Sequence, residues 1–311
     1  MPVQSTKGRS TKRRSKSRNG RRRVNQKGGS KTYNQITQTL KKRSQCHPRV
    51  SASAEEDKGC LPVSVLMKVA RKNKISVTPT NALRRIADHL KIDPSNQSSV
   101  LKALPGLSEE EKETLAKTWL RPERPSSWKD DPDAWLDTTN IRDVLKQYEE
   151  VYSFFKFFGP YPIDFAVADP QSRPGERCLI NEMCSLDLKK EAAAGKKILG
   201  FSFNLDPHYK SGSHWVAAVI NIPAKECYYF DSYGMRPPTQ IYKFMQWLTI
   251  QEPEMKLKMN AREFQRKNSE CGMFCIYFIV CMLEGESFQD FCKGDHSDAL
   301  MLNLREHVYS K

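Results

Sequence analysis

The feature that most constrains the fold is the almost entirely apolar stretch at residues 271–283. Such a run predicts a buried helix, and it is shorter than the ~20 apolar residues needed to cross a bilayer. No other segment reaches that length, and the N-terminus is charged without the apolar region of a signal peptide. We therefore expect a soluble protein with no membrane partner, in which Cys275 and Cys281 are small core residues of this helix.

The basic character of the chain is confined to one end. The formal net charge is +15, yet residues 1–54 contain 16 Lys and Arg and no Asp or Glu, so the remainder is nearly neutral. This segment is rich in Ser, Thr, Gln and Gly and has almost no apolar periodicity, which predicts a disordered basic tail. Two interpretations stay open. In the first, the tail binds the phosphate backbone of nucleic acid or is read as a nuclear address; in the second, it only makes the protein more soluble.

The cysteines do not form a recognisable framework. There are nine, an odd number without regular spacing, which is unlike a secreted disulfide scaffold and predicts a reduced, intracellular protein. Cys178, Cys184, Cys46 and His47 include no CxxC pair, so we expect no zinc site or other metal. A GxxxxGK[ST] phosphate loop is also absent from the sequence, and no cofactor is expected.

Residues 55–130 predict a helical N-terminal arm and a linker. Apolar residues recur at helical spacing from Cys60 to about Leu120, as in a small bundle. Ser108 and Glu111 form a capping-box signature at the start of one helix. Prolines among charges at residues 121–133 indicate a linker.

Residues 131–311 predict a domain of a different kind. Strands are expected at residues 197–204, 215–222, 227–231 and 255–259, with helices at about 240–250 and 271–283. The second and third of these strands form an antiparallel hairpin around residues 223–226. Strands followed by segregated helices favour an α+β domain over a doubly wound sheet.

Four residues of this domain can supply the parts of a cysteine nucleophile site. Cys271 begins the apolar helix, where the helix dipole stabilises a thiolate and Ser269 is expected to cap the helix. His214 begins one strand of the hairpin and Asp231 ends the next, so antiparallel pairing brings base and orienting carboxylate to the same end of the sheet. Gln265 lies in the polar loop before Cys271, where its amide can face an oxyanion together with the backbone N–H of Cys271.

Alone, each of these residues is weak evidence, because a single Cys, His or Asp is usually structural. Their order is more specific: His214-Trp215, Asp231, Gln265 and Cys271-Gly272 resemble the ubiquitin-like-protein protease and adenovirus protease superfamily of cysteine peptidases, whereas papain-like enzymes have Cys first. The motifs around them resemble the branch of large DNA viruses, of the African swine fever virus protease type. These motifs are Asn204-Leu205-Asp206-Pro207-His208, Gly212-Ser213-His214-Trp215, Phe230-Asp231-Ser232-Tyr233-Gly234 and Asn268-Ser269-Glu270-Cys271-Gly272.

The resemblance implies a central mixed sheet with helices, with the nucleophile at a helix N-terminus. It also implies that Trp215, Trp135 and Asn268 bind substrate, the two tryptophans flanking a narrow groove that admits Gly-Gly before the scissile bond. Cellular members commonly have Trp-Leu-Asn-Asp where this chain has Trp135-Leu136-Asp137-Thr138. A second interpretation of Trp135, as an anchor of the first helix of the domain, therefore stays open. His208 is expected to be an exposed loop residue and not the base.

The function that the resemblance implies is an endopeptidase that processes viral core or capsid precursors, located in the virion and host cytoplasm or in the host nucleus. An isopeptidase acting on ubiquitin-like modifiers and an acetyltransferase with a Cys acyl intermediate are alternatives. A non-catalytic virion protein that packages nucleic acid through its tail is another. Gly28-Gly29-Ser30 is a candidate self-cleavage site, although a Gly pair also serves flexibility.

Overall fold

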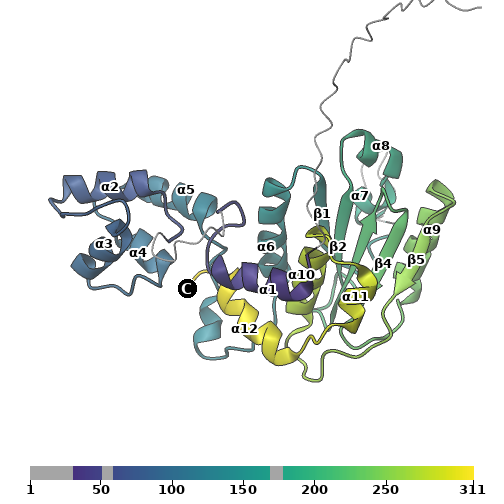
Figure 1. Ribbon diagram of the computed structural model, residues 1–311. Helices are drawn as coiled ribbons and strands as arrows, with labels where there is room; N and C mark the ends of the chain where they lie inside the picture. Colours follow the sequence, from purple (N-terminus) through teal and green to yellow (C-terminus); the bar gives the residue numbers. More distant parts are fainter. Residues whose placement is uncertain (1–30, 51–58, 169–177) are drawn as a thin grey trace, which may run out of the picture.

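A mixed five-stranded sheet lies at the centre of the C-terminal half of the chain (Figure 1). The computed structural model describes residues 31–50, 59–168 and 178–311, so Gly28-Gly29-Ser30 and most of the basic residues of the tail lie outside the described part. The β1–β2 and β4–β5 pairs are parallel, and the two pairs between them are antiparallel. The strands follow one another in chain order: β1 (Phe155–Pro162), β2 (Ile198–Asn204), β3 (Trp215–Asn221), β4 (Glu226–Phe230) and β5 (Lys256–Met259).

The predicted α+β class is confirmed, and the hairpin is the β3–β4 pair. Strand β1 is missing from the sequence prediction because Gly159, Pro160 and Pro162 are poor strand formers. It lies at one edge of the sheet, where prolines are tolerated since no neighbour requires their N–H groups.

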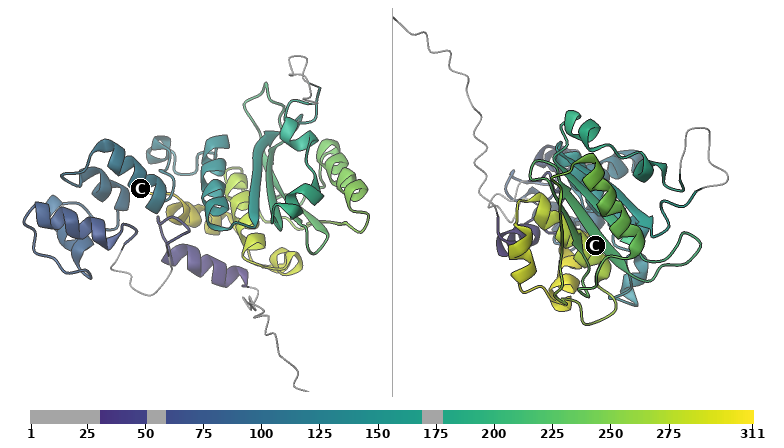
Figure 2. Two further views of the ribbon diagram at one scale, coloured as in Figure 1. Left: turned by 90° about the horizontal axis from the view of Figure 1, so that it is seen from above. Right: turned by 90° about the vertical axis from the view of Figure 1, so that its right-hand side faces the viewer.

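Helices cover both faces of the sheet (Figure 2). Alternate residues of β3 point to opposite faces, so Ala217 and Val219 pack with α10 while Val216, Ala218 and Ile220 pack with α9. The helices of this domain are α6 (Thr138–Val151), α7 (Asn181–Cys184), α8 (Leu188–Ala193), α9 (Thr239–Gln251), α10 (Cys271–Leu283), α11 (Phe288–Lys293) and α12 (Asp298–Val308).

Helix α10 is the apolar stretch that the sequence predicts, with the same bounds. All 13 of its residues are buried, including Cys275 and Cys281. The helix packs closely on the sheet, since a Cβ at Gly200 of β2 would lie 3.0 Å from Ile279 Cγ2. Within the described ranges, no helix combines the length and apolarity that a membrane span requires.

The N-terminal arm is a small helical bundle with its own core, as predicted, and extends to one side of the sheet (Figures 1 and 2). Ser108 and Glu111 form the expected capping box at the start of its last helix. Leu66, Val69, Leu83 and Ile86 are among its buried residues. Its helices are α2 (Val63–Lys72), α3 (Ala82–Leu90), α4 (Gln97–Ala103) and α5 (Glu109–Trp119).

The prediction that residues 1–54 are disordered is wrong for their described part. Helix α1 (Tyr33–Lys42) begins with a capping box between Thr32 and Gln35. Ile36 and Leu40, four residues apart on one face, are buried in the same cluster as Leu304 and Val308 of α12. Two apolar residues among many polar ones do not reveal a helix by composition. They suffice to hold the helix in place once α12 provides an apolar surface for them to pack on.

The segment at residues 121–133, predicted as a linker, is packed against the C-terminal domain. It contains a short 3-10 helix, η2 (Ser126–Lys129), whose Trp128 is buried and meets the ring of Tyr309 edge-on at 5.0 Å. Glu123 also forms a β-bridge with Ser310. Prolines exclude regular helix here but do not prevent ordered packing.

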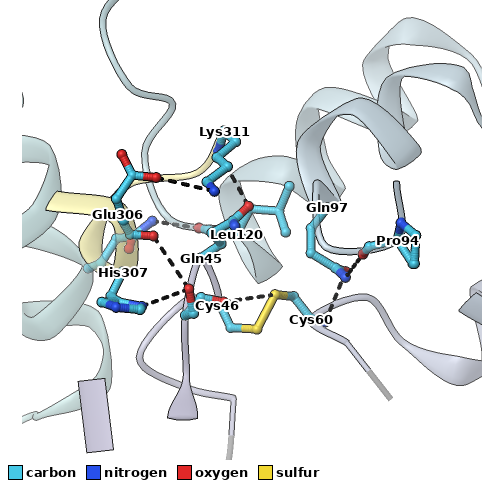
Figure 3. The surroundings of a disulfide bond; sticks show 11 residues. Gln45, Cys46, Cys60, Pro94, Gln97, Leu120, Glu306, His307 and Lys311 are labelled. Atoms are coloured by element: carbon cyan, nitrogen blue, oxygen red, sulfur yellow. Dashed lines mark hydrogen bonds and ion pairs between the residues drawn. A yellow bond between two sulfur atoms is a disulfide. The ribbon is translucent and has the colours of Figure 1, made fainter. Parts of the chain in front are cut away.

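The expectation that all cysteines are reduced is wrong for two pairs, Cys46–Cys60 and Cys178–Cys184. Figure 3 shows the first pair at the base of the arm, where Cys46 forms a β-bridge with Leu120 and the backbone N–H of Cys60 donates to Gln97 Oε1 at 3.2 Å. The tertiary fold brings these Cα atoms to 5.0 Å, a separation that a disulfide requires. Cysteine spacing alone contains no such information.

Loss of the Cys46–Cys60 bond should loosen the base of the arm. The bond joins residues 14 positions apart, and closing a loop of this size stabilises a fold by about 3 kcal/mol. We expect Cys46→Ser/Cys60→Ser to lower the free energy of unfolding of the arm by up to that amount, measured by amide hydrogen exchange in α2–α5. Cys292→Ser is the matched control because Cys292 is a free thiol. Equal protection in both proteins would show that the bond does not stabilise the arm.

Candidate active site

The β3–β4 register brings His214 and Asp231 together. His214 immediately precedes β3, Asp231 immediately follows β4, and Ala217 pairs with Phe230 across the two strands. His214 Nε2 and Asp231 Oδ1 are 2.8 Å apart. The predicted pairing at one end of the sheet is therefore present, and Nδ1 of the ring is left for another partner.

Asp231 is held by groups that the sequence does not reveal. Its Oδ1 also accepts from the backbone N–H of Tyr233 at 2.8 Å. Asn260, directly after β5, accepts from the backbone N–H of Asp231 at 2.9 Å and donates to its carbonyl at 2.7 Å. The position of Asn260 at the end of a predicted strand is the only sequence signal for this role.

Cys271 is the first residue of α10 and is buried beside His214. The predicted cap is wrong: the N-cap residue is Glu270 and not Ser269, and the Glu270 side chain makes no capping hydrogen bond. The positive end of the helix dipole still lies at the thiol and stabilises its ionised form.

The ring of His214 is set up to carry a proton. Burial lowers the pKa of His214, but hydrogen bonds to Asp231 and Cys271 and the negative charges of both outweigh this effect and raise the pKa to about 9. The ring of Tyr233 stacks on it with centroids 4.8 Å apart. His214 therefore has both a hydrogen bond to Cys271 and the basicity needed to accept a proton from it.

Gln265 is completely buried near this pair. Ser232 Oγ donates to Gln265 Oε1 at 2.6 Å, and Gln265 Nε2 donates to the carbonyl of Lys267 at 2.7 Å. These bonds fix which end of the amide is the donor. Since an amide nitrogen has two hydrogens, one remains for an incoming oxyanion.

A surface groove with a volume of about 380 Å³ lies beside the site, and both Trp135 and Trp215 line it. Trp215 is 6% exposed, with its Nε1–H donating to the carbonyl of Leu136 at 2.8 Å, whereas Trp135 is 47% exposed. Trp135 is therefore a groove wall and not a buried anchor of the first helix. Asn268 lies exposed in the loop before Cys271 and is not among the residues lining the groove.

His208 is exposed, as predicted. It lines the same groove and pairs with Asp164 at 2.7 Å, whereas His214 is the residue that pairs with Asp231. Among residues 31–50, 59–168 and 178–311, no group of three or more His, Cys, Asp or Glu is arranged to hold a metal ion.

Comparison with known proteins connects this geometry to a family. Residues 175–311 match the model of the Ulp1 protease family, C-terminal catalytic domain. The chain is 30% identical over 168 residues to a protein of Acanthamoeba polyphaga mimivirus named as a thiol protease. It is also 28% identical over 118 residues to the SUMO-1 cysteine protease of African swine fever virus. These matches span 52% and 43% of the two viral proteins and 52% and 35% of this chain.

The fold is similar to that of a solved viral enzyme. The crystal structure of the African swine fever virus protease superposes with a TM-score of 0.59 over 86% of this chain and 96% of that protein, at 18% identity. The similarity includes much more of the chain than the family model does, and it establishes the fold.

Removing the carboxylate beside His214 should make its ring less basic. Burial lowers the pKa of His214, and the Asp231 carboxylate counteracts this effect. Asp231→Asn removes that negative charge, so the pKa of His214 should fall from about 9 by about 1 to 3 pH units. Because protonation of His214 stabilises the native state, this stabilisation is complete below the unfolded pKa of about 6.5 and is lost as pH rises through 9.

NMR titration of the His214 imidazole in both proteins measures this difference. Asp164→Asn is the matched control, because it removes the carboxylate partner of His208 and leaves His214 untouched. An unchanged His214 titration in Asp231→Asn would contradict the assigned contact.

Proposed function

We propose, from the match of residues 175–311 to the model of the Ulp1 protease family, that the protein is a cysteine endopeptidase with Cys271 as nucleophile and His214 as its base. The observation that carries the proposal is the 2.8 Å bond between His214 and Asp231 beside a cysteine at a helix N-terminus. The nucleophilic thiol, its proton acceptor and the group that orients the acceptor are all present.

The proposed reaction proceeds through an acyl-enzyme. His214 accepts the proton of Cys271 Sγ as Sγ bonds to the substrate carbonyl carbon. The C–N bond then breaks, and the amine leaves with that proton from His214. Water then gives a proton to His214 as its oxygen attacks the thioester, which releases the acid and regenerates the thiol–imidazole pair. Asp231 holds the ring in position throughout.

The oxyanion of each tetrahedral intermediate is assigned to two donors. One is the backbone N–H of Cys271 and the other is the free hydrogen of Gln265 Nε2. Preorganised donors of this kind act strongly where water is excluded, and Gln265 is fully buried and fixed by Ser232.

We propose that substrates present Gly-Gly before the scissile bond. The groove is lined by Trp215, which follows His214 directly, and by the exposed ring of Trp135. Glycine lacks the Cβ that would collide with two indoles. Precursors of viral core or capsid proteins are the proposed substrates, in keeping with relatives of viral origin.

Removal of ubiquitin-like modifiers is the second candidate function. It is favoured by the name of one relative, a SUMO-1 cysteine protease, and it uses the same residues. Purified protein should be incubated with a core precursor containing an internal Gly-Gly and, separately, with a ubiquitin-like isopeptide conjugate. New termini after Gly-Gly in the precursor support the endopeptidase, whereas cleavage of the conjugate alone supports the isopeptidase.

Variants of the site should separate chemistry from folding. Cys271→Ser and His214→Ala should each abolish cleavage, and Gln265→Ala should lower kcat about 10- to 1000-fold as one oxyanion donor is lost. Cleavage of the precursor is measured beside thermal unfolding. Cys292→Ser is the control, since this free cysteine lies outside the site. Wild-type cleavage in Cys271→Ser would remove the mechanism, and a non-catalytic packaging protein would then be the better explanation.

We also propose that the basic N-terminal segment concentrates the enzyme on viral DNA, where packaged precursors gather. Residues 1–30 contain 11 Lys and Arg and no acidic residue, and α1 begins only at Tyr33. Each phosphate contact that releases a counterion makes binding weaker as salt rises.

Deletion of residues 1–30 should keep the fold and peptide cleavage but weaken DNA binding and flatten its salt dependence. Fluorescence anisotropy with duplex DNA at several salt concentrations measures both. Equal affinity and slope in the truncated protein would place DNA binding on the folded surface.

A further inference from the structure

Arg305 of α12 lies between the nucleophile and the groove wall, although nothing in its sequence neighbourhood suggests chemistry. Its side chain is 1% exposed. Nε donates to Glu270 Oε2 at 2.9 Å, and Nη2 lies 2.8 Å from Glu270 Oε1. This two-point pair fixes the residue directly before Cys271.

The same guanidinium also holds the backbone on both sides of the site. Nη2 donates to the carbonyl of Ser269 at 3.3 Å. Nη1 donates to the carbonyls of Ala134 at 2.6 Å and Pro132 at 3.3 Å. Trp135 directly follows Ala134, so one side chain contacts both the nucleophile loop and the segment that presents the groove wall.

That wall segment is held at two further points. The Nε1–H of Trp215 donates to the carbonyl of Leu136 at 2.8 Å. A Cβ at Gly272 would lie 2.9 Å from Leu136 Cβ, so the second residue of α10 directly abuts this segment. The distance between the Cys271 thiol and Trp135 is therefore fixed by the packing of this segment against Trp215 and the start of α10.

The position of Arg305 is itself fixed from behind. Its Cζ lies 4.6 Å from the centre of the Trp128 ring, a cation–π contact. Trp128 in turn meets Tyr309, and Tyr309 Oη donates to the carbonyl of Asn140 in α6 at 3.1 Å. Residues 121–133 and α12 thus form the support of the site.

We propose that Arg305 is a positioning residue for the peptidase reaction, setting through Glu270 the Cys271 N–H that binds the oxyanion and through Ala134 the distance from Trp135 to the thiol. This inference rests on the proposed function. The two contacts of the guanidinium should have separate kinetic effects. The contact with Glu270 affects kcat, because the Cys271 N–H acts in the transition state, and the contact with Ala134 affects KM, because the groove wall acts in substrate binding.

Three variants divide these effects. Glu270→Gln keeps the volume but loses the charged pair, so kcat should fall about 10- to 100-fold with little change in KM, as displacement of a catalytic group does. In Arg305→Lys, a single ammonium group cannot contact both Glu270 and the carbonyl of Ala134, so kcat should fall and KM should also rise several-fold. The double variant Arg305→Met/Glu270→Met removes both buried charges together, which avoids an unpaired ion and lets the fold survive. It should show both defects.

The full chain is assayed with a Gly-Gly precursor peptide, alongside the rate of Cys271 alkylation by iodoacetamide and thermal unfolding. Arg124→Met is the matched control, since Arg124 pairs with Glu306 at 3.7 Å on the surface. Relaxed selectivity, seen as cleavage of a Gly-Ala peptide by Arg305→Lys, would be the signature of a displaced wall and is not expected from mere loss of stability.

A folded double variant with wild-type kcat, KM and selectivity would overturn the inference while leaving the proposed function intact. If the wild-type protein cuts no precursor and its Cys271 is alkylated no faster than Cys292, the proposed function is overturned and this inference with it. Slower turnover of the double variant with an unchanged melting temperature supports the positioning role.

Discussion

Burial of α10 is the constraint on which the rest of the structure depends. Every residue of this helix is buried, so it requires apolar surface on all sides: the sheet on one, and α6 and α12 on others. An apolar helix of this length stabilises the fold by its transfer from water, and it fixes its first residue, Cys271, at the edge of the core. The thiol therefore occupies a rigid position at the positive end of a helix dipole.

The sheet supplies the partners of that thiol by register. A hairpin that pairs Ala217 with Phe230 places the residues just outside each strand side by side, and these are His214 and Asp231. A shift of one residue would turn side chains to the opposite face. The backbone pairing and the Asn260 amide thus hold the geometry before substrate arrives, so little reorganisation is needed during reaction.

The N-terminal half is tied to this domain more tightly than its composition suggests. Helix α1 packs on α12, and residues 121–133 place Trp128 beneath Arg305. The arm keeps its own core but is joined at its base by the Cys46–Cys60 bond. Helix α12, on which α1 packs, contacts the residue preceding Cys271 through Arg305.

The sequence by itself determined the α10 helix, the hairpin, the arm bundle and the order of His214, Asp231, Gln265 and Cys271, because each depends on local periodicity or short spacing. Only the tertiary structure decided the folding of α1, the disulfides, the role of Asn260 and the position of Arg305. These depend on partners far apart in the chain: Arg305 and Ala134, for example, are separated by 171 positions. Local propensity contains no information about such contacts, since they exist only after the sheet and α10 have brought the segments together.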